Sequence, residues 1–195
     1  MKGTHLVYDK MSLQQQADLF SGIKPNESYD ALEWTQFFDH FDKVVNGTVP
    51  LYKAGTGEGH LILCLHGAGH SAMSFACLAA HLKSDCTVYA FDWRGHGDHF
   101  CENESDLSQE TLIGDTVKVM EFVMSQNPGR SINLIGHSMG GSIATKAAAY
   151  ILSELADQPI SKALSSLLVV DVVEGTAMEH LPFMEQVVNM RPVHF

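Results

Sequence analysis

The chain has 195 residues, a hydrophobic fraction of 45% and a formal net charge of -11 at pH 7. These values are typical of a soluble globular protein with one core, and the acidic balance argues against a nucleic-acid partner because phosphate contacts need basic patches. No run approaches the length of a membrane span and the amino terminus lacks a signal-peptide pattern, so we expect no membrane partner. We expect a cytoplasmic location, with the nucleus as a further option, and four reduced cysteines, because none has C-x-x-C spacing.

The first half of the chain contains a polar start, a hairpin and a buried strand. Residues 1–30 are polar and mixed and are expected to form a loosely held arm, whereas residues 31–195 are predicted to form one domain. Asn46-Gly47 is the dipeptide that best accepts the positive φ angles of a type I′ hairpin turn. The continuous apolar run 60–65 predicts a central parallel strand.

The segments that follow alternate between helical and extended patterns. They are a helix over 74–82, a strand over 87–91, a helix over 108–125 with Ser108 as N-cap, a strand over 131–135, a helix over 142–152, a strand over 167–170 and a helical segment within 175–190. This alternation predicts an α/β fold with a mostly parallel sheet and flanking helices. Functional sites in such sheets lie at the carboxyl ends of the strands.

The motif Gly-x-Ser-x-Gly, with Ser138 at its centre, lies between the strand 131–135 and the helix 142–152. This strand–turn–helix setting is typical of a nucleophile elbow, in which a sharp turn raises one hydroxyl above the sheet. Gly136 and Gly140 would let the strand and helix backbones approach closely around that hydroxyl. We therefore predict Ser138 as a nucleophile.

A second glycine-rich loop, His66-Gly67-Ala68-Gly69-His70, directly follows the strand 60–65. Serine hydrolases need two backbone donors for an oxyanion hole. One is the residue after the nucleophile, here Met139, and the other comes from a loop of this kind, which points to Ala68. His66 and His70 are expected to shape this loop.

The serine also needs a base and an acid that orients the base. Asp171 ends a buried strand and follows Ser138, as the acid does in the Ser–acid–His order of serine hydrolases on such sheets. Asp92 precedes Ser138 and is interpreted as structural, tying its loop together with Arg94. No histidine is assigned as the base: His180 and His194, which follow Asp171, are expected to be surface residues, His137 should point away from the hydroxyl, and His66 and His70 belong to the glycine-rich loop.

A metal site is the competing interpretation of the histidine-rich segment 94–99. Its sequence, RGHGDH, comes close to the H-x-H-x-D-H pattern of metallo-β-lactamase-like hydrolases. Arg94 stands where the first histidine should be, which removes a ligand and places a cation there. We therefore expect no metal.

Three stretches together resemble the protein phosphatase methylesterase family of α/β-hydrolases. They are LHGAGHS at 65–71, IGHSMGG at 135–141 and VDVVEGTAM at 170–178, the last being the most specific. The resemblance runs from about residue 31 to the end. It implies an α/β-hydrolase fold, no cofactor, and removal of the methyl ester from the carboxy-terminal leucine of the protein phosphatase 2A catalytic subunit, which would be the partner.

By position, the resemblance makes Ser138 the nucleophile, Asp171 the acid, and the backbone N–H groups of Ala68 and Met139 the oxyanion donors. The family commonly has glycine in place of Ala68, which a backbone donor tolerates. The family's catalytic histidine, last strands and most of its lid lie beyond the last residue, so we expect the amino-terminal part of a methylesterase. Without that base the chain is predicted to be nearly inactive, and the strand that ends at Asp171 is predicted to be an uncovered, aggregation-prone edge.

Two other functions stay open at this point. One is a non-catalytic short form that docks the phosphatase without demethylating it. The other is a general α/β-hydrolase that acts on small esters.

Overall fold

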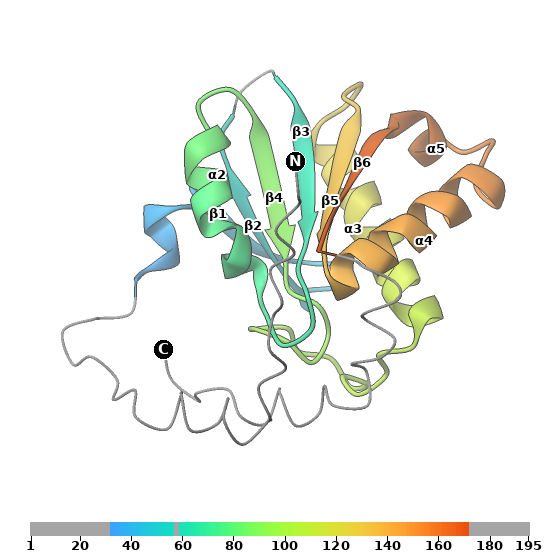
Figure 1. Ribbon diagram of the computed structural model, residues 1–195, viewed down its shortest axis with the longest axis horizontal. Helices are drawn as coiled ribbons and strands as arrows, with labels where there is room; N and C mark the ends of the chain where they lie inside the picture. Colours follow the sequence, from blue (N-terminus) through green and yellow to red (C-terminus); the bar gives the residue numbers. More distant parts are fainter. Residues whose placement is uncertain (1–31, 57–58, 172–195) are drawn as a thin grey trace, which may run out of the picture. The chain divides into compact units, whose positions relative to one another are not determined.

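The computed structural model describes residues 32–56 and 59–171. Their strands form one sheet in the order β1-β2-β4-β3-β5-β6 (Figure 1). The bounds are β1 His40–Val44, β2 Val49–Ala54, β3 Leu61–Leu65, β4 Thr87–Phe91, β5 Ile132–His137 and β6 Leu164–Val170. Strands β4, β3, β5 and β6 run parallel, whereas β2 is antiparallel to β1 and β4. The predicted mostly parallel α/β sheet is thus confirmed.

Four helices connect these strands in the described part of the chain. They are α2 Ala76–Leu82, α3 Gln109–Gln126, α4 Met139–Ser153 and α5 Pro159–Ala163, with 3₁₀ turns at Trp34–Gln36 and Ala72–Phe75. The predicted helices over 108–125 and 142–152 are confirmed within a few residues, while α5 was not predicted. The expected arm over 1–30 and the helical segment within 175–190 lie outside the described residues.

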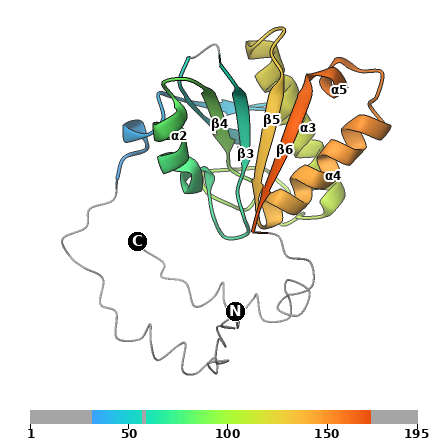
Figure 2. The same cartoon turned by 45° about the horizontal axis from the view of Figure 1, so that its top comes forward.

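The sheet is covered on both faces, which explains why its central strands are continuously apolar. Successive side chains of a strand point to opposite faces. Leu61, Leu63 and Leu65 of β3 belong to the cluster that includes side chains of α3 and α4. Ile62 and Cys64 belong to the cluster that includes α2. Figure 2 shows α2 on one face and α3 with α4 on the other.

The hairpin between β1 and β2 forms as the Asn-Gly signal predicts. Val44 pairs with Val49, and the N–H of Thr48 donates to the carbonyl of Val45. Asn46 and Gly47 have the predicted positive φ angles, 62° and 77°, but Val45 also has a positive φ of 50°. The N–H of Thr48 donates to the carbonyl of Val44 at 3.1 Å as well, so the connection is a four-residue loop that is longer than a two-residue type I′ turn. The hairpin adds the antiparallel strands β1 and β2 beside β4.

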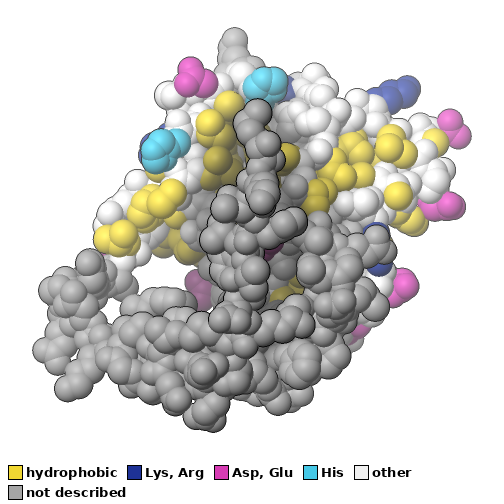
Figure 3. Space-filling model, viewed as in Figure 1, with side chains coloured by type: hydrophobic (Ala, Val, Ile, Leu, Met, Phe, Trp, Pro, Cys, Tyr) yellow, Lys and Arg dark blue, Asp and Glu magenta, His cyan; other side chains and the backbone are white. Residues whose placement is uncertain are grey.

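Strand β6 is the outer strand of the described sheet, with β5 on one side only. It begins three residues before the predicted strand, because Ser165 and Ser166 interrupt the apolar pattern on which the prediction relied. The Ser166 hydroxyl donates to Oδ1 of Asn133 on β5 at 2.6 Å. Figure 3 shows apolar side chains gathered over β6 and α4, where the exposed ones are Tyr150, Leu152, Leu168, Val169 and Val170. Among the described strands β6 is the outermost; whether the edge is uncovered in the whole chain stays a prediction. Within residues 32–56 and 59–171, no helix has the length and apolar character needed to cross a membrane.

Candidate active site

Ser138 occupies the sharp turn between β5 and α4. Its φ is 52° and its ψ is -119°, a conformation that residues with a Cβ rarely adopt. The N–H of Ser138 donates to the carbonyl of Val170, the last residue of β6, at 2.9 Å. Such strain persists where the surrounding structure overdetermines the backbone, and it concentrates at functional sites.

Two glycines make the turn possible by letting three backbone segments touch. A Cβ on Gly136 would lie 2.5 Å from the carbonyl oxygen of Gly140, and a Cβ on Gly140 would lie 2.1 Å from the carbonyl oxygen of Leu65. Neither distance is compatible with a side chain. The close approach that the sequence predicts for these two positions is therefore present.

The glycine-rich loop after β3 lies against the serine. Leu65 is opposite Gly136 in the parallel pairing of β3 with β5, so the two strands end side by side. A Cβ on Gly67 would lie 3.1 Å from the Cβ of Ser138. The predicted donors Ala68 and Met139 belong to these two adjoining segments. Met139 is the first residue of α4, where helical N–H groups have no partner within the helix.

His66 shapes the glycine-rich loop from within the core, as expected. Its buried ring has Nδ1 2.8 Å from the carbonyl oxygen of Gly67, and its Nε2 accepts the N–H of Trp93 at 3.1 Å. A carbonyl only accepts, so Nδ1 carries the proton and the ring is neutral. Burial lowers the pKa of His66 to about 4. The indole N–H of Trp93 closes the arrangement by donating to the carbonyl of His66 at 3.0 Å.

Asp92, at the end of β4, has the structural role that was predicted, but with different partners. Its Oδ1 accepts the N–H of Ala72 at 2.7 Å and its Oδ2 accepts the N–H of Asp98 at 3.1 Å. Burial raises the pKa of Asp92, and these two hydrogen bonds act in the opposite direction. The expected tie between Asp92 and Arg94 is wrong, because Arg94 is paired elsewhere.

Arg94 forms a bidentate ion pair with Asp115 on the buried face of α3. Its Nε lies 2.7 Å from Oδ2 and its Nη2 3.0 Å from Oδ1, and Nη1 donates to the carbonyl of Asn103 at 3.1 Å. The hydrogen bonds from Arg94 to Asp115 raise the pKa of Arg94. The pair attaches the loop between β4 and α3 to the helix.

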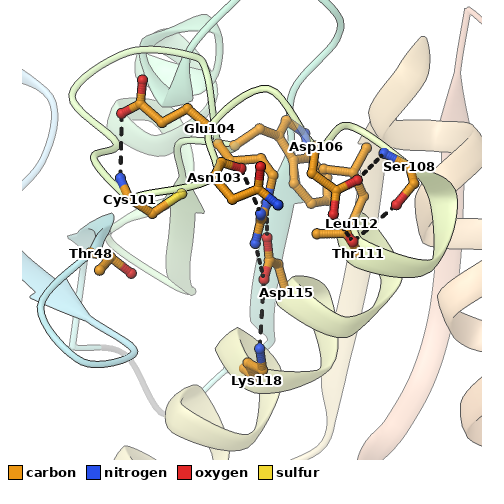
Figure 4. A network of polar contacts seen from close by, with 12 residues as sticks. Thr48, Cys101, Asn103, Glu104, Asp106, Ser108, Thr111, Leu112, Asp115 and Lys118 are labelled. Carbon is orange, nitrogen blue, oxygen red and sulfur yellow. Dashed lines mark hydrogen bonds and ion pairs between the residues drawn. The ribbon is translucent and has the colours of Figure 1, made fainter.

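Further polar contacts close the same loop at the start of α3 (Figure 4). The Asp106 carboxylate accepts the N–H of Ser108 at 3.2 Å and the hydroxyl of Thr111 at 2.7 Å. Ser108 stands at the N-cap position as predicted, but its hydroxyl donates to Thr111 rather than capping a backbone N–H. Lys118 lies at the edge of this network, 3.9 Å from Asp115.

Asp171, the predicted acid, directly follows β6 at the same edge of the sheet as Ser138. Its Oδ2 lies 3.7 Å from Nε2 of His137, and its side chain is 76% exposed. The His137 ring lies beside Asp171 and the glycine-rich loop, where a Cβ on Gly67 would be 3.0 Å from its Nδ1. In the part of the chain that the structure describes, no histidine ring is hydrogen-bonded to the Ser138 hydroxyl; His180 and His194 lie outside that part.

The described part of the chain offers no metal site, and a cavity beside α5 lies away from Ser138. Among residues 32–56 and 59–171, no three His, Cys, Asp or Glu side chains are arranged to hold a metal ion. A cavity of about 540 Å³ lies between the end of α3 and α5, at the amino-terminal edge of β5 and thus at the opposite end of that strand from Ser138. All four cysteines are free thiols.

The sequence reasoning missed His96 as a contact of the glycine-rich loop. Its Nε2 accepts the N–H of Gly69 at 2.9 Å, and its Nδ1 lies 3.0 Å from the carbonyl oxygen of Arg94. The signal was available: β3 and β4 are adjacent parallel strands, so the loops that follow them must meet at one edge.

Comparison with known proteins supports the resemblance stated above. Protein phosphatase methylesterase 1 of Mus musculus is 37% identical over 93% of this chain and 47% of the relative. The protein of the same name from Schizosaccharomyces pombe is 36% identical over 87% of this chain and 51% of the relative. The chain thus spans about half the length of the curated relatives it matches, and it aligns with their amino-terminal part.

Solved structures show the same fold. Potato (Solanum tuberosum) epoxide hydrolase I superposes with a TM-score of 0.55 at 23% identity, over 67% of this chain and 39% of that one. The thioesterase domain from the curacin biosynthetic pathway superposes with a TM-score of 0.54 at 24% identity, over 80% of this chain and 55% of that one. Residues 62–192 match the model of the Alpha/beta hydrolase family. The chain therefore belongs to the alpha/beta hydrolase family.

Proposed function

We propose that Ser138 is the nucleophile of a serine carboxylesterase of the phosphatase methylesterase type. The substrate we assign is the carboxy-terminal leucine methyl ester of the protein phosphatase 2A catalytic subunit. The observation that carries the proposal is the conformation of Ser138, which has a positive φ at the head of α4 and lies against the backbone of Gly67. The names of the relatives support the choice of substrate class.

The proposed reaction is an acyl transfer in two halves. The Ser138 oxygen attacks the ester carbonyl carbon, and the N–H groups of Ala68 and Met139 stabilise the resulting oxyanion. Collapse of the tetrahedral intermediate breaks the bond to the methoxy group, which leaves as methanol after gaining a proton. Water then cleaves the acyl-enzyme and releases the free leucine carboxylate.

The base of this reaction is not assigned to a described histidine. Both ring nitrogens of His66 and of His96 are engaged by backbone groups. His137 has its Nε2 directed at Asp171 rather than at Ser138. Asp171 would orient the base and stabilise its charged form, as the acid of a triad does.

Labelling with a fluorophosphonate tests the nucleophile without requiring full turnover. We expect slow covalent labelling of the 195-residue chain, because no described histidine is assigned as the base, and we expect this labelling to be lost in Ser138→Ala. Ser142→Ala, one turn further along α4, is the matched control and should label like the parent chain. Intact mass spectrometry measures both.

The outcomes separate the proposal from its alternatives. Equal labelling of Ser138→Ala and the parent chain would remove Ser138 as the nucleophile. Poor labelling with retained binding to the methylated phosphatase would favour the docking form. Turnover of small esters without demethylation of the phosphatase would favour a general esterase.

A further inference from the structure

The peptide groups on either side of Ala68 are each held by a histidine ring. The carbonyl of Gly67, which belongs to the peptide that carries the Ala68 N–H, accepts from Nδ1 of His66 at 2.8 Å. The N–H of Gly69, in the next peptide, donates to Nε2 of His96 at 2.9 Å. The Gly67 carbonyl also accepts the N–H of His70 at 3.2 Å. In a trans peptide the C=O and N–H point in opposite directions, so the bonds to the Gly67 carbonyl orient the Ala68 N–H, and the bond to His96 holds the peptide that follows it.

Both rings must be neutral to make these contacts. The Nδ1 of His96 faces the carbonyl oxygen of Arg94 at 3.0 Å, so that nitrogen carries a proton. The Gly69 N–H is a donor, so Nε2 of His96 must present its lone pair. A second proton on His96 would place two donors face to face and break this bond.

The two histidines differ in their access to protons. His66 is fully buried, and its pKa is lowered to about 4 by burial, so it stays neutral in the physiological range. His96 is only half-buried. Its ring is faced by His66 from the end of β3, with the ring centroids 5.3 Å apart, and by the Asp92 carboxylate from the end of β4. Arg94 and Asp98 are the charged residues within two positions of His96 on its own loop, which also carries Glu102, Glu104 and Asp106 further along the chain.

We propose that His96 is a positioning residue that fixes the Ala68–Gly69 peptide, and that protonation of His96 releases this peptide and misplaces the oxyanion donor. The catalytic part of this inference rests on the proposed function, because Ala68 matters to the reaction only as an oxyanion donor. The geometric part does not. The hydrogen bonds of His96 go to Gly69 and Arg94, so we assign it an effect through the loop.

Hydrogen exchange of the Gly69 amide, expressed as a protection factor, tests the geometric part. In His96→Leu we expect protection of this amide to fall about tenfold or more, because its hydrogen bond to Nε2 is lost. In His96→Gln the side-chain carbonyl replaces Nε2 and protection should be largely kept. His81→Leu, a change on the exposed surface of α2, is the control and should leave Gly69 unchanged.

The pH dependence of the same protection factor needs no variant. In the parent chain protection of Gly69 should fall on acidification, and in His96→Gln it should not, because glutamine does not titrate. Protection of Gly69 that is unchanged in His96→Leu, or equally pH-dependent in His96→Gln, would overturn the inference.

The rate of fluorophosphonate labelling tests the catalytic part. We expect labelling to slow about tenfold in His96→Leu, less than the roughly 100-fold or larger loss that follows removal of an oxyanion donor outright. Labelling should recover in His96→Gln. If Gly69 loses protection but no chain labels at Ser138, the proposed function fails and the positioning role stands. If Ser138 labels at the parent rate in His96→Leu, the catalytic role of His96 fails and the proposed function stands.

Discussion

The glycine-rich loop after β3 and the serine turn after β5 adjoin each other but are stabilised by opposite means. The loop is held by polar side chains: His66 and His96 bond two of its peptides, and Asp92 bonds Ala72. The turn is held by contact between backbones, at distances that exclude a Cβ at Gly136 or Gly140. The stability of the loop should therefore depend on pH, and the stability of the turn on whether a side chain is added to its glycines.

Adding one methyl group should damage the turn most. Gly140→Ala is expected to lower the free energy of unfolding by about 3 kcal/mol or more, because the new Cβ would lie 2.1 Å from the carbonyl oxygen of Leu65. Gly114→Ala is the matched control: a Cβ there meets nothing within 4 Å, and alanine should stabilise α3 by about 1 kcal/mol. Urea unfolding of both variants measures the difference. Equal effects at the two sites would show that the turn is not tightly packed.

Acid should act on the loop through His66. Because its pKa is about 4 in the folded chain and ordinarily 6.5, the unfolded chain binds a proton that the folded chain does not between these values. The stability that neutral His66 contributes is therefore complete above pH 6.5 and is lost as the pH falls to about 4, by up to about 3 kcal/mol. The free energy of unfolding of the parent chain should thus fall more steeply over this window than that of His66→Gln. Parallel curves for the two proteins would contradict this assignment.

The smallest effect is a gain in stability at the nucleophile itself. Ser138→Gly should stabilise the fold by about 1 kcal/mol relative to Ser138→Ala, because only glycine adopts a φ of 52° without strain. Both variants lack the hydroxyl, so the comparison isolates the backbone. Thermal unfolding is the measurement. An alanine variant as stable as the glycine variant would mean that Ser138 is not strained in solution.

Sequence patterns predicted the parts of the fold in which local signals and tertiary structure agree. The strand β4 was placed at its observed bounds, and β3, β5, α3 and α4 within a few residues, because their apolar runs and helical faces directly reflect burial. The helix α5 is only five residues long, too short for a periodic pattern. The pairing of β2 with β4 has no local signal, because it joins segments far apart in the chain.

At the candidate site, the sequence motifs predicted where the backbone turns lie better than they predicted which side chains pair with each other. The Gly-x-Ser-x-Gly motif located the turn, and the second glycine-rich loop was correctly placed beside it. The predicted partner of Arg94, Asp92, was wrong because the prediction rested on proximity in sequence. A better signal was Asp115, a carboxylate within the apolar stripe of α3, since a buried charge needs a counter-ion.

The hydrogen bond from the Ser138 N–H to the carbonyl of Val170 joins the reactive turn to the outermost strand of the described sheet. Strands at a sheet margin open more readily than central ones. Each time the end of β6 detaches from β5, Ser138 loses the acceptor of its own amide. The lifetime of the turn is therefore limited by the lifetime of the strand end, and pairing along the side of β6 that no described strand covers would prolong both.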